Sequence, residues 1–471
     1  MPLWTSSEAI KATGGSCSVV WKAEGISIDT RTIMPGDLFI ALTDRRDGHE
    51  FVAHALAKGA AAALVSHVPT NVDKNAPLLI VKDVMEGLNA LGRAARSRTN
   101  ARIVAVTGSV GKTSTKEMLK TVLAFQGRTH ASIASYNNHW GVPLSLASMP
   151  YDTEFGIFEI GMNHPGEIGP LSQIVQPHVG MITSIAPAHM EAFNGIDEIA
   201  AEKAEIFAGL DSFGVAILPA DVDTIDILVE RALRKKATIV GFGTKADAYR
   251  LIALEAHKDV TVIQAQFRGA PAVLKLNAIG RHFAMNALGV LAAVEALAGD
   301  PGRAAVDLFR WKPSAGRGRR ELISLDPDKS FQEFELIDDA YNANPASMVA
   351  AFESLASMQP AVVGTAGRKS RKIAILGDML ELGVNELTYH SSLAKNLHLC
   401  SLDVVHCVGT RMRSCYDGLP LEIRGDWVET AEEFKSKLQT MIMPGDMVLV
   451  KGSLGSNVST IVDPIRKLGQ R

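Results

Sequence analysis

The sequence predicts an α/β protein with three domains, and two observations support this fold class. Short apolar runs of strand length alternate with stretches of helical apolar spacing along most of the chain, which is typical of parallel sheets with right-handed helical crossovers. The chain has 471 residues, a length that corresponds to about three domains of ordinary size. We place the domains at residues 1–98, 99–313 and 314–471 and expect the first to be the smallest.

The first segment has the pattern of a small α/β domain. We expect strands at 38–42, 61–65 and 78–81 and helices at 51–58 and 84–96. Two polar clusters interrupt this pattern, with candidate binding residues Ser27, Asp29, Thr30 and Arg31 in the first and Asp47 and His49 in the second. Turn and helix-cap roles account for either cluster, but the first also suits a sugar nucleotide, through hydrogen bonds and an arginine–phosphate contact.

The second segment begins with the sequence VTGSVGKTST at 106–115. An apolar strand at 102–106 precedes it, and residues 113–125 have the apolar spacing of a helix. Strand, glycine loop and helix are the context that a phosphate-binding loop needs. Val106 stands where the usual motif has its first glycine, so the loop is a shortened variant, GxxGKT.

The residue types in this loop suit a nucleotide with a bound metal ion. Gly108 and Gly111 allow a tight turn that points backbone N–H groups and the helix N-terminus at one anion. Lys112 can reach the outer phosphates, and the Thr113 hydroxyl can bind Mg²⁺. We therefore predict a nucleotide site here.

Polar side chains also follow two later strands of this segment. The expected strand at 155–160 ends near Glu159, and the strand at 179–185 leads to His189. Because ligands bind beyond the carboxyl ends of strands in open α/β sheets, both side chains are candidates to face the phosphates. Asn137 and Asn138, in SYNNHWGVP, offer amide groups to a ligand.

Two helices of the segment carry further candidates. The helix expected at 197–207 contains Lys203 among acidic residues, which by itself indicates a solvent-facing lysine. Its neighbour Glu202 is expected to face another side of the helix and to tolerate replacement. Asn286 lies near the start of a long amphipathic helix at 280–297.

The third segment again alternates strands and helices. We expect strands at 335–338, 372–376, 404–408 and 447–450 and helices at 347–356 and 388–397. The run Arg317-Gly318-Arg319-Arg320 lies at its junction with the second segment. It is either a solvated linker or a source of positive charge that a moving domain brings to phosphate.

Composition limits the classes of partner. The chain has 48 basic and 51 acidic residues, so its formal net charge of −3 predicts no nucleic-acid surface. Its four cysteines lack paired CxxC spacing and fit reduced thiols better than a zinc site or a disulfide framework. We see neither a signal peptide nor an apolar run long enough to span a bilayer, so we expect a cytoplasmic protein without a transmembrane segment.

Several motifs together are similar to a known family. They are TGSVGKTSTKEML, YNNHWGVPLSL, FEIGMNHPGEI, APAHMEAF, GRHFAMNAL, DDAYNANPASM and LGDMLELG, and in this order they cover nearly the whole chain. The chain resembles the Mur ligases, which use the shortened GxxGKT loop. The resemblance implies an N-terminal domain for the UDP part of a substrate, a central P-loop ATPase with a parallel-rich sheet, and a C-terminal Rossmann-like domain that closes over both.

The resemblance also implies roles for named residues. ATP binding is implied for Gly108, Ser109, Val110, Gly111, Lys112, Thr113, Ser114, Asn286, Arg319 and Asp339. Two Mg²⁺ ions are implied, with Thr113 and Glu159 at the first and His189 and a carbamate of Lys203 at the second. Contacts to the UDP substrate are implied for Ser27, Asp29, Thr30, Arg31, Asp47, His49, Asn137 and Asn138, and Asn342 and Asn344 lie on the D-alanyl-D-alanine side. Lys112, Lys203 and His189 are the implied catalytic residues.

The implied activity is that of an ATP-dependent acid–D-amino-acid ligase. ATP phosphorylates the terminal carboxylate of UDP-N-acetylmuramoyl-tripeptide, and the amine of D-alanyl-D-alanine attacks the acyl phosphate, in peptidoglycan precursor synthesis. Positive charge from Mg²⁺ and Lys112 stabilises the transferring phosphoryl group, and no protein nucleophile is needed. We expect the enzyme to act as a monomer.

Three alternatives differ from this reading by sequence features. A ligase that adds the third residue of the peptide is expected to carry DNPR, whereas this chain has DAYNANPAS. Folylpolyglutamate synthetase begins near its phosphate loop, whereas 98 residues precede the central domain here. A P-loop switch protein needs no UDP-sugar domain. The C-terminal KGSLGSNVSTIV has KGS as the family does but differs from the family pattern after it, so the resemblance assigns no substrate contact there.

Overall fold

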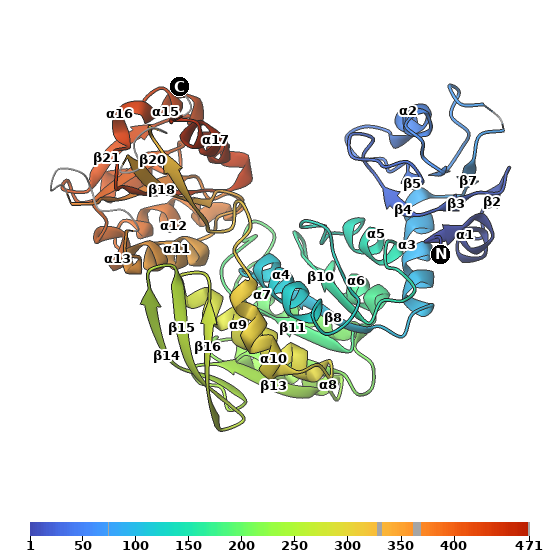
Figure 1. Cartoon of the computed structure of the whole chain (residues 1–471), viewed down its shortest axis with the longest axis horizontal. Coiled ribbons are helices and arrows are strands. Elements are labelled where there is room, and N and C mark those ends of the chain that lie inside the picture. The colour runs from blue at the N-terminus through green and yellow to red at the C-terminus, as the bar shows by residue number, and fades with distance from the viewer. Residues whose placement is uncertain (74, 327–331, 361–368, 470–471) are drawn as a thin grey trace.

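The computed structural model describes residues 1–73, 75–326, 332–360 and 369–469 and confirms the predicted α/β class. The chain forms an N-terminal, a central and a C-terminal unit, each built on its own large sheet (Figure 1). The first and last of these lie at opposite ends of the molecule, with the central unit between them. Over the described ranges, no helix is both long and apolar enough to cross a membrane.

The N-terminal sheet has the strand order β2-β7-β6-β5-β4, and its neighbours run parallel except for β2 and β7. Its strands are β2 (Ser16–Cys17), β4 (Gly25–Ser27), β5 (Asp37–Ile40), β6 (Ala62–Val65) and β7 (Leu78–Ile80). A separate antiparallel pair joins β1 (Trp4–Thr5) to β3 (Lys22–Ala23). The helices are α1 (Ser6–Thr13), α2 (Val52–Ala57) and α3 (Val84–Ser97).

Local sequence explains these elements. β6 is apolar along its whole length because both of its faces are buried, as in other parallel sheets. Helix α1 begins with a capping box between Thr5 and Glu8 and ends at Gly14, whose φ of 67° suits a residue without a side chain. The Asp83 side chain caps the N-terminus of α3.

The central sheet has the order β16-β15-β14-β13-β12-β11-β8-β10-β9. Strands β9 to β14 and β8 run parallel, and β14, β15 and β16 form an antiparallel edge. The parallel strands are β8 (Arg102–Thr107), β9 (Thr129–Ala131), β10 (Phe155–Glu159), β11 (Val179–Ile182), β12 (Val215–Pro219) and β13 (Thr238–Gly243). The edge strands are β14 (Tyr249–His257), β15 (Val260–Phe267) and β16 (Ala270–Leu276).

Helices cover both faces of this sheet. They are α4 (Lys112–Leu123), α5 (Gly141–Ala147), α6 (Ile168–Val175), α7 (Ile196–Ala204), α8 (Ile225–Arg234), α9 (Arg281–Ala296) and α10 (Pro301–Asp307). The apolar residues of α4 and α9 pack in one core cluster, and those of α5 to α8 pack in another. The predicted helices at 113–125 and 280–297 match α4 and α9 within two residues at each end.

The antiparallel edge from Tyr249 to Leu276 was not predicted from the sequence. Its strands alternate exposed and buried side chains along much of their length. In β15, for example, Thr261, Ile263 and Ala265 are buried, whereas the residues between them are more exposed. They are joined by two short turns at 258–259 and 268–269. Such hairpins need no helical crossover, so the alternation of strands and helices that predicts the rest of the sheet does not extend to them.

The C-terminal sheet has the order β17-β18-β22-β19-β20-β21, in which only the β17–β18 pair, among the described pairs, is antiparallel. The strands are β17 (Arg319–Ser324), β18 (Glu333–Asp339), β19 (Lys372–Gly377), β20 (Val404–Val408), β21 (Arg424–Val428) and β22 (Met447–Lys451). The helices are α11 (Pro345–Ser357), α12 (Glu386–Leu393), α13 (Leu397–Cys400), α14 (Arg413–Gly418), α15 (Ala431–Lys435), α16 (Leu438–Met441) and α17 (Val462–Arg466).

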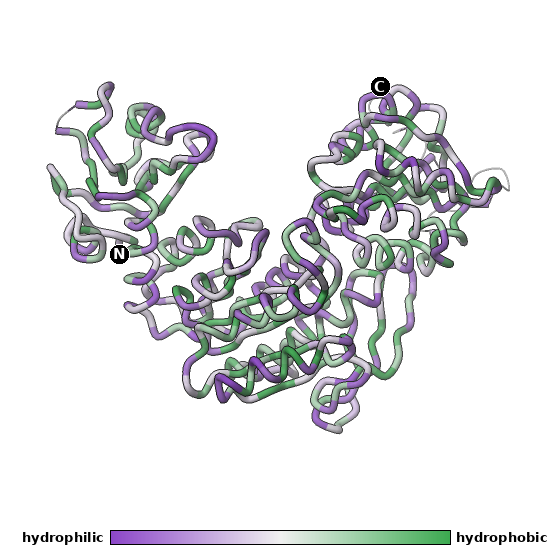
Figure 2. Tube along the Cα trace, turned by 180° about the vertical axis from the view of Figure 1, so that it is seen from behind, coloured by the Kyte–Doolittle hydropathy of each residue, from purple (hydrophilic) through white to green (hydrophobic). Residues whose placement is uncertain are grey.

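Each unit has its own apolar interior. Figure 2 shows hydrophobic segments running through all three, with many of the hydrophilic segments on outer turns. Arg98 contacts aromatic rings of both the N-terminal and the central unit. Its guanidinium carbon lies 4.0 Å from the Trp4 ring centre and 3.9 Å from the Tyr151 ring centre. Trp4 Nε1 also donates to the backbone oxygen of Ala147 at 2.8 Å. Trp4 and Arg98, which directly follows α3, belong to the N-terminal unit, whereas Ala147 and Tyr151 belong to the central unit. These contacts therefore join the two units.

Candidate active site

The phosphate loop lies between β8 and α4, as predicted. Gly108 has a φ of 149° and Gly111 a φ of 90°, conformations that favour glycine. A Cβ added to Gly108 would lie 2.0 Å from Thr183 Oγ1. Ser109 N donates to Ser184 O at 2.9 Å, so the segment that follows β11 fixes the shape of the loop. Neither Thr183 nor Ser184 was predicted from the sequence to contribute to this loop.

Lys112 and Thr113 lie at the start of α4. Lys112 Nζ donates to the backbone oxygen of Gly108 at 2.7 Å, so the ammonium group lies against the loop itself. Burial lowers the Lys112 pKa from its usual value, Glu159 opposes this effect, and Arg317 adds to it. Because burial removes water from the Lys112 ammonium group, an anionic ligand beside it would stabilise its positive charge.

Two predicted residues, Thr113 and Asn137, form hydrogen bonds with the carboxylate of a third, Glu159. Thr113 Oγ1 donates to Glu159 Oε2 at 3.0 Å, and Asn137 Nδ2 donates to Glu159 Oε1 at 2.7 Å. Glu159 ends β10, directly beside the loop, and is almost fully buried. A carboxylate and a hydroxyl are ligands that a hard divalent cation prefers.

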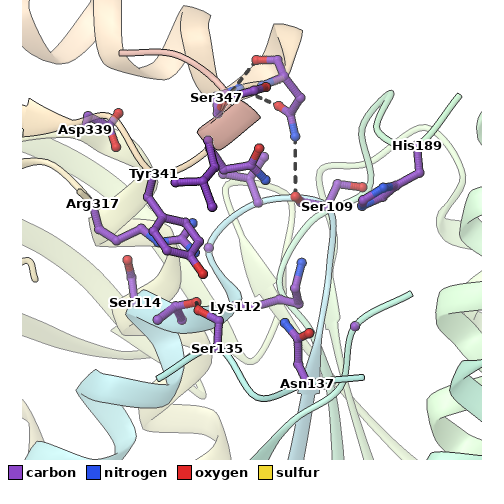
Figure 3. Close-up of a pocket in the computed structure, with 18 of the residues that line it drawn as sticks. Ser109, Lys112, Ser114, Ser135, Asn137, His189, Arg317, Asp339, Tyr341 and Ser347 are labelled. Carbon is purple, nitrogen blue, oxygen red and sulfur yellow. Dashed lines mark hydrogen bonds between the residues drawn. The ribbon is translucent and has the colours of Figure 1, made fainter. Parts of the chain in front are cut away.

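A pocket joins this loop to the C-terminal unit. Its central-unit side includes the loop residues 109–114, Ser135, Asn137, Glu159 and His189, and its C-terminal side includes Arg317, Asp339, Tyr341, Asn342, Asn344, Glu381 and Lys451. Figure 3 shows Lys112 and Ser114 on one side of this space and Arg317, Asp339 and Tyr341 on the other. The predicted nucleotide residues of the two units therefore face one another.

The C-terminal wall carries a buried ion pair that was not predicted. Lys451 Nζ lies 2.7 Å from Asp339 Oδ2 and donates to Asn342 O at 3.1 Å. Burial raises the Asp339 pKa, and the neighbouring Lys451 opposes that effect. Lys451 belongs to the KGS sequence, for which no substrate contact was predicted, yet it lines the pocket.

Asn344 connects the two units directly. Its side chain caps α11 by accepting from Ser347 N at 2.9 Å, and its Nδ2 donates to Ser109 O at 3.5 Å. In Figure 3, dashed lines mark hydrogen bonds at Ser347 and at Ser109. Asn342 accepts a hydrogen bond from Ala343 N through Oδ1. Both predicted asparagines line the pocket.

The structure places Arg319, the arginine predicted to contact ATP, outside the lining of the phosphate-loop pocket. Arg319 starts β17 and lines a different pocket together with Lys312, Arg320 and Glu321. The arginine that lines the phosphate-loop pocket is Arg317, whose guanidinium carbon lies 4.1 Å from the Tyr341 ring centre. Gly318 separates the two arginines and has a φ of 88°, so the chain turns sharply between them. Sequence alone does not show this change of direction.

His189 also lines the pocket, as predicted for a residue that follows β11. Its Nδ1 lies 2.7 Å from Glu381 Oε2 of the C-terminal unit, and this contact was not predicted. The hydrogen bond from His189 lowers the Glu381 pKa from its usual value.

Lys203 is buried, so its interpretation as a solvent-facing lysine is wrong. Its side chain is 1% exposed, and burial together with the nearby Lys112 ammonium lowers its pKa well below the usual value. The contacts of Glu202 oppose the expectation that this residue tolerates replacement. Glu202 is buried and accepts backbone hydrogen bonds from Gly166 at 2.8 Å and from Ile168 at 2.9 Å, at the start of α6. The charged sequence around these residues therefore gives no sign that the second half of α7 is buried, although its first turn is exposed.

Asn286 lies beside the loop in α9. A Cβ on Gly111 would lie 2.8 Å from Asn286 Oδ1, so the two residues are in close contact. The buried Nδ2 of Asn286 has no hydrogen-bond partner within the described part of the chain. An acceptor on a bound ligand would satisfy this group.

The predicted UDP residues of the N-terminal unit lie away from the phosphate-loop pocket and make local contacts. Asp29 pairs with Arg31 at 2.6 Å, Ser27 Oγ accepts from Asp29 N at 3.2 Å, and Thr30 O accepts from Lys58 Nζ at 2.8 Å. Asp47 Oδ1 accepts from His49 N at 3.0 Å, and His49 Nε2 accepts from Ser66 N at 2.9 Å. Asn138 Oδ1 accepts from Gly141 N, the first residue of α5, at 2.9 Å. These are the turn and cap roles that the sequence also allowed.

Residues suited to metal binding are split between separate points. Across the described ranges, no group of three or more histidine, cysteine, aspartate and glutamate side chains is placed to hold a metal ion. The Thr113–Glu159 contact uses a hydroxyl and one carboxylate, so a cation there would need further oxygen ligands from a nucleotide or water.

Comparisons with known proteins find similarity along nearly the whole chain. Family models match residues 22–124 (Mur ligase family, catalytic domain), 106–294 (Mur ligase middle domain) and 318–454 (Mur ligase, glutamate ligase domain). The UDP-N-acetylmuramoyl-tripeptide–D-alanyl-D-alanine ligase of Rickettsia prowazekii is 34% identical over 98% of this chain and 99% of its own length.

Two solved structures have a similar fold. MurF from Acinetobacter baumannii superposes with a TM-score of 0.83 at 29% identity, covering 99% of both chains. MurF from Thermotoga maritima in complex with ADP has a TM-score of 0.77 at 23% identity, covering 95% of this chain and 98% of its own. The latter likeness concerns the fold alone.

Proposed function

Because this chain belongs to the Mur ligase family, we propose that it joins D-alanyl-D-alanine to UDP-N-acetylmuramoyl-tripeptide in an ATP-dependent reaction. The observation that carries this proposal is the 34% identity to the Rickettsia ligase over nearly the full length of both proteins. The chain has DAYNANPAS and lacks DNPR, which favours this acceptor over the diamino acid of the ligase that adds the third residue.

The proposed reaction has two covalent steps. A carboxylate oxygen of the tripeptide attacks the γ-phosphorus of ATP, the bond to the β-phosphate oxygen breaks, and ADP leaves. The amine of D-alanyl-D-alanine then attacks the acyl carbon, a proton is lost, and phosphate leaves as the amide forms. The first nucleophile is the substrate itself, so the chain has only to bind, orient and stabilise charge.

We assign ATP binding to the loop residues 108–114 together with residues of the C-terminal wall. Loop N–H groups at the start of α4 suit phosphate oxygens, and Lys112 adds a cation. Arg317 replaces Arg319 in this assignment because Arg317 lines the pocket. Asp339 is assigned to the nucleoside, together with Asn286, whose Nδ2 has no hydrogen-bond partner among the described residues.

We propose two Mg²⁺ sites. Thr113 and Glu159 fit the first, since their oxygens lie 3.0 Å apart beside the phosphate loop. His189 and a carbamate of Lys203 are assigned to the second. A bound Mg²⁺ would neutralise phosphate charge and polarise the transferring phosphoryl group. The low pKa of Lys203 supports this role, because a neutral amine is the form that reacts with CO₂.

The remaining assignments follow the arrangement of the chain. We propose residues 1–98, 99–313 and 314–471 as the three domains, each of which contains one of the large sheets. The UDP part is assigned to the N-terminal domain near Ser27, Asp29, Thr30, Arg31, Asp47 and His49, with Asn137 and Asn138 at its border with the centre. Asn342 and Asn344 are assigned to the D-alanyl-D-alanine side. We further propose a monomer in the cytoplasm, where the free thiols of all four cysteines are stable.

Product mass tests the proposed function. Purified protein is given ATP, Mg²⁺ and UDP-N-acetylmuramoyl-tripeptide, with and without D-alanyl-D-alanine. We expect phosphate release together with a product heavier than the tripeptide by one D-alanyl-D-alanine unit less water. Addition of a single diamino acid to the dipeptide precursor, with no reaction on the tripeptide, would assign the chain to the third-residue ligase instead.

A further inference from the structure

The loop at 380–383 of the C-terminal unit touches the loop at 189–191 of the central unit at two independent points. The first is the ion pair between Glu381 Oε2 and His189 Nδ1, at 2.7 Å. The second is a close backbone approach at Gly383, where an added Cβ would lie 3.0 Å from Met190 O and 3.2 Å from Glu191 Cα. Both contacts join segments from different domains.

The C-terminal side of this contact is firmly held. Met379 N donates to His390 Nε2 at 2.9 Å, and Leu380 N donates to Ser453 Oγ at 3.0 Å. Leu382 is buried in the core of the unit. Glu381 lies between these anchors with a side chain that is 57% exposed, so the loop presents its carboxylate outward, toward the central unit.

Both partners have unusual backbone conformations. Glu381 has a φ of 63° and His189 a φ of 56°. A side chain in this left-handed region costs on the order of 1 kcal/mol, so each conformation has to be maintained by its surroundings. Strained residues that meet across a domain boundary point to a function of the contact itself.

The ion pair also decides which nitrogen of His189 is available. Glu381 engages Nδ1, so Nε2 is the ring nitrogen left for a ligand in the pocket that His189 lines. Metal-binding histidines commonly have their second nitrogen held by a carboxylate, which fixes the tautomer and the ring orientation.

We infer that Glu381 is a positioning residue that couples domain closure to the second metal site. When the 380–383 loop docks on the 189–191 loop, the Glu381 carboxylate orients His189 to bind a divalent cation through Nε2. The metal half of this inference rests on the proposed function, which assigns His189 to that cation. The docking half rests only on the contact between the two loops. Glu381 itself touches neither substrate nor reacting atoms in this role.

Small-angle scattering on the full chain tests the docking half, with and without a non-hydrolysable ATP analogue. Glu381→Ala should give a larger radius of gyration than the unmodified chain, since the closed arrangement loses its ion pair. Gly383→Ala should act in the same direction by pushing the loops apart. Glu386→Ala is the matched control, because Glu386 pairs with Arg411 at 2.6 Å within the C-terminal unit and should leave the radius unchanged. Equal radii for Glu381→Ala, Gly383→Ala and the unmodified chain would overturn the docking.

Mn²⁺ binding tests the metal half without turnover. Bound Mn²⁺ is measured by electron paramagnetic resonance in the presence of the ATP analogue. Loss of a carboxylate that orients a metal-binding histidine weakens metal affinity by about 10- to 100-fold, which we expect for the weaker site in Glu381→Ala. Glu381→Gln should lose less, because its amide oxygen can still accept from Nδ1–H. The His189→Ala and Glu381→Ala effects should not add, since one residue acts through the other.

Unchanged Mn²⁺ affinity in Glu381→Ala, or full additivity with His189→Ala, would overturn the positioning role. Neither experiment contains the tripeptide or D-alanyl-D-alanine. A failure of the product-mass assay therefore bears on the proposed function, and a failure of the scattering or Mn²⁺ experiments bears on Glu381.

Discussion

Asp339 and Lys451 are register partners on the neighbouring strands β18 and β22, and their side chains form a 2.7 Å ion pair in the wall of the candidate ATP pocket. Lys451 has a side chain that is only 3% exposed, and that of Asp339 is 20% exposed. Each charge therefore depends on the other for the stabilisation that water would otherwise supply.

Lys451→Met should destabilise the chain and weaken ATP binding. The methionine fills similar volume but leaves the Asp339 carboxylate without its partner, at a cost of about 3 kcal/mol in the free energy of unfolding. Urea titration measures this loss. Lys437→Met is the control, because Lys437 lies 3.5 Å from Asp426 with both side chains more than 40% exposed, and exposed pairs contribute about 0–1 kcal/mol. Equal losses in both variants would contradict the prediction.

Lys451 shows how a correct strand prediction can miss a site residue. The strand at 447–450 was predicted, and β22 indeed spans Met447–Lys451. The functional position depends on which strand lies beside it, and β22 pairs with β18 although more than a hundred residues separate Lys451 from Asp339. Strand order is set by packing between distant elements, which a local apolar pattern does not contain.

Gly108→Ala should abolish tight ATP binding while the domains still fold. The new Cβ would lie 2.0 Å from Thr183 Oγ1, so either the loop or the segment after β11 has to move. We expect ATP affinity to fall by at least about tenfold, or 1.4 kcal/mol, in calorimetric titration. Gly14→Ala is the control, since Gly14 also has a positive φ, of 67°, but nothing lies within 4 Å of its added Cβ. That variant should lose stability only; weakened ATP binding in it would show that general strain causes the effect.

Acid should destabilise the C-terminal unit through His406. Burial lowers the His406 pKa from its usual 6.5 to about 4, and its Nδ1 accepts from Asp426 N at 2.9 Å, which requires a neutral ring. Between pH 4 and pH 6.5, His406 is protonated in the unfolded chain but neutral in the folded chain. The free energy of unfolding therefore falls as pH drops from 6.5 to 4, by up to about 1.4 kcal/mol per pH unit for this one residue.

His406→Gln tests this pH dependence, because the glutamine amide oxygen can accept the same hydrogen bond but does not titrate. Urea midpoints at pH 7 and pH 5 should differ less in the variant than in the unmodified chain. His398→Gln replaces an exposed histidine and should leave the difference between the two pH values unchanged. An equal pH dependence in His406→Gln and the unmodified chain would exclude His406 as its source.

The elements around the phosphate loop were the most predictable part of the site, since short-range sequence encodes both their structure and their chemistry. Gly108, Lys112 and Thr113 take the positions that the motif implies, and Glu159 follows from the end of its strand. Arg317, Glu381 and Lys451 come from the other domain, and each reaches the pocket through a turn or strand pairing. The positions of these three residues depend on how the central and C-terminal units are oriented, and no periodic pattern in the sequence predicts that orientation.

Lys203 is the residue for which sequence pattern and structure differ most. Its neighbours in DEIAAEKAEIF are charged, which indicates a solvated helix face, but the side chain is 1% exposed. Burial lowers the Lys203 pKa well below its usual value, and the nearby Lys112 ammonium adds to this effect. A neutral amine in this place can form a carbamate with CO₂, which converts it into an anionic oxygen ligand for Mg²⁺.

We therefore expect Lys203→Ala to lower turnover by about 10- to 100-fold while ATP still binds through the loop around Lys112. Acetate should restore part of the activity, because its carboxylate can occupy the space of the lost carbamate. Incorporation of ¹³C-labelled CO₂ into the unmodified chain, followed by nuclear magnetic resonance, gives a readout that does not depend on turnover.

The control for this experiment is Asp197→Ala rather than a change at Glu202. Asp197 lies exposed in the first turn of the same helix, whereas Glu202 accepts two backbone hydrogen bonds at the start of α6, so its removal should destabilise the central domain. Asp197→Ala should retain normal turnover. If Lys203→Ala also retained it, or if acetate increased the activity of both variants equally, the buried amine would have no part in metal binding, and its low pKa would reflect packing alone.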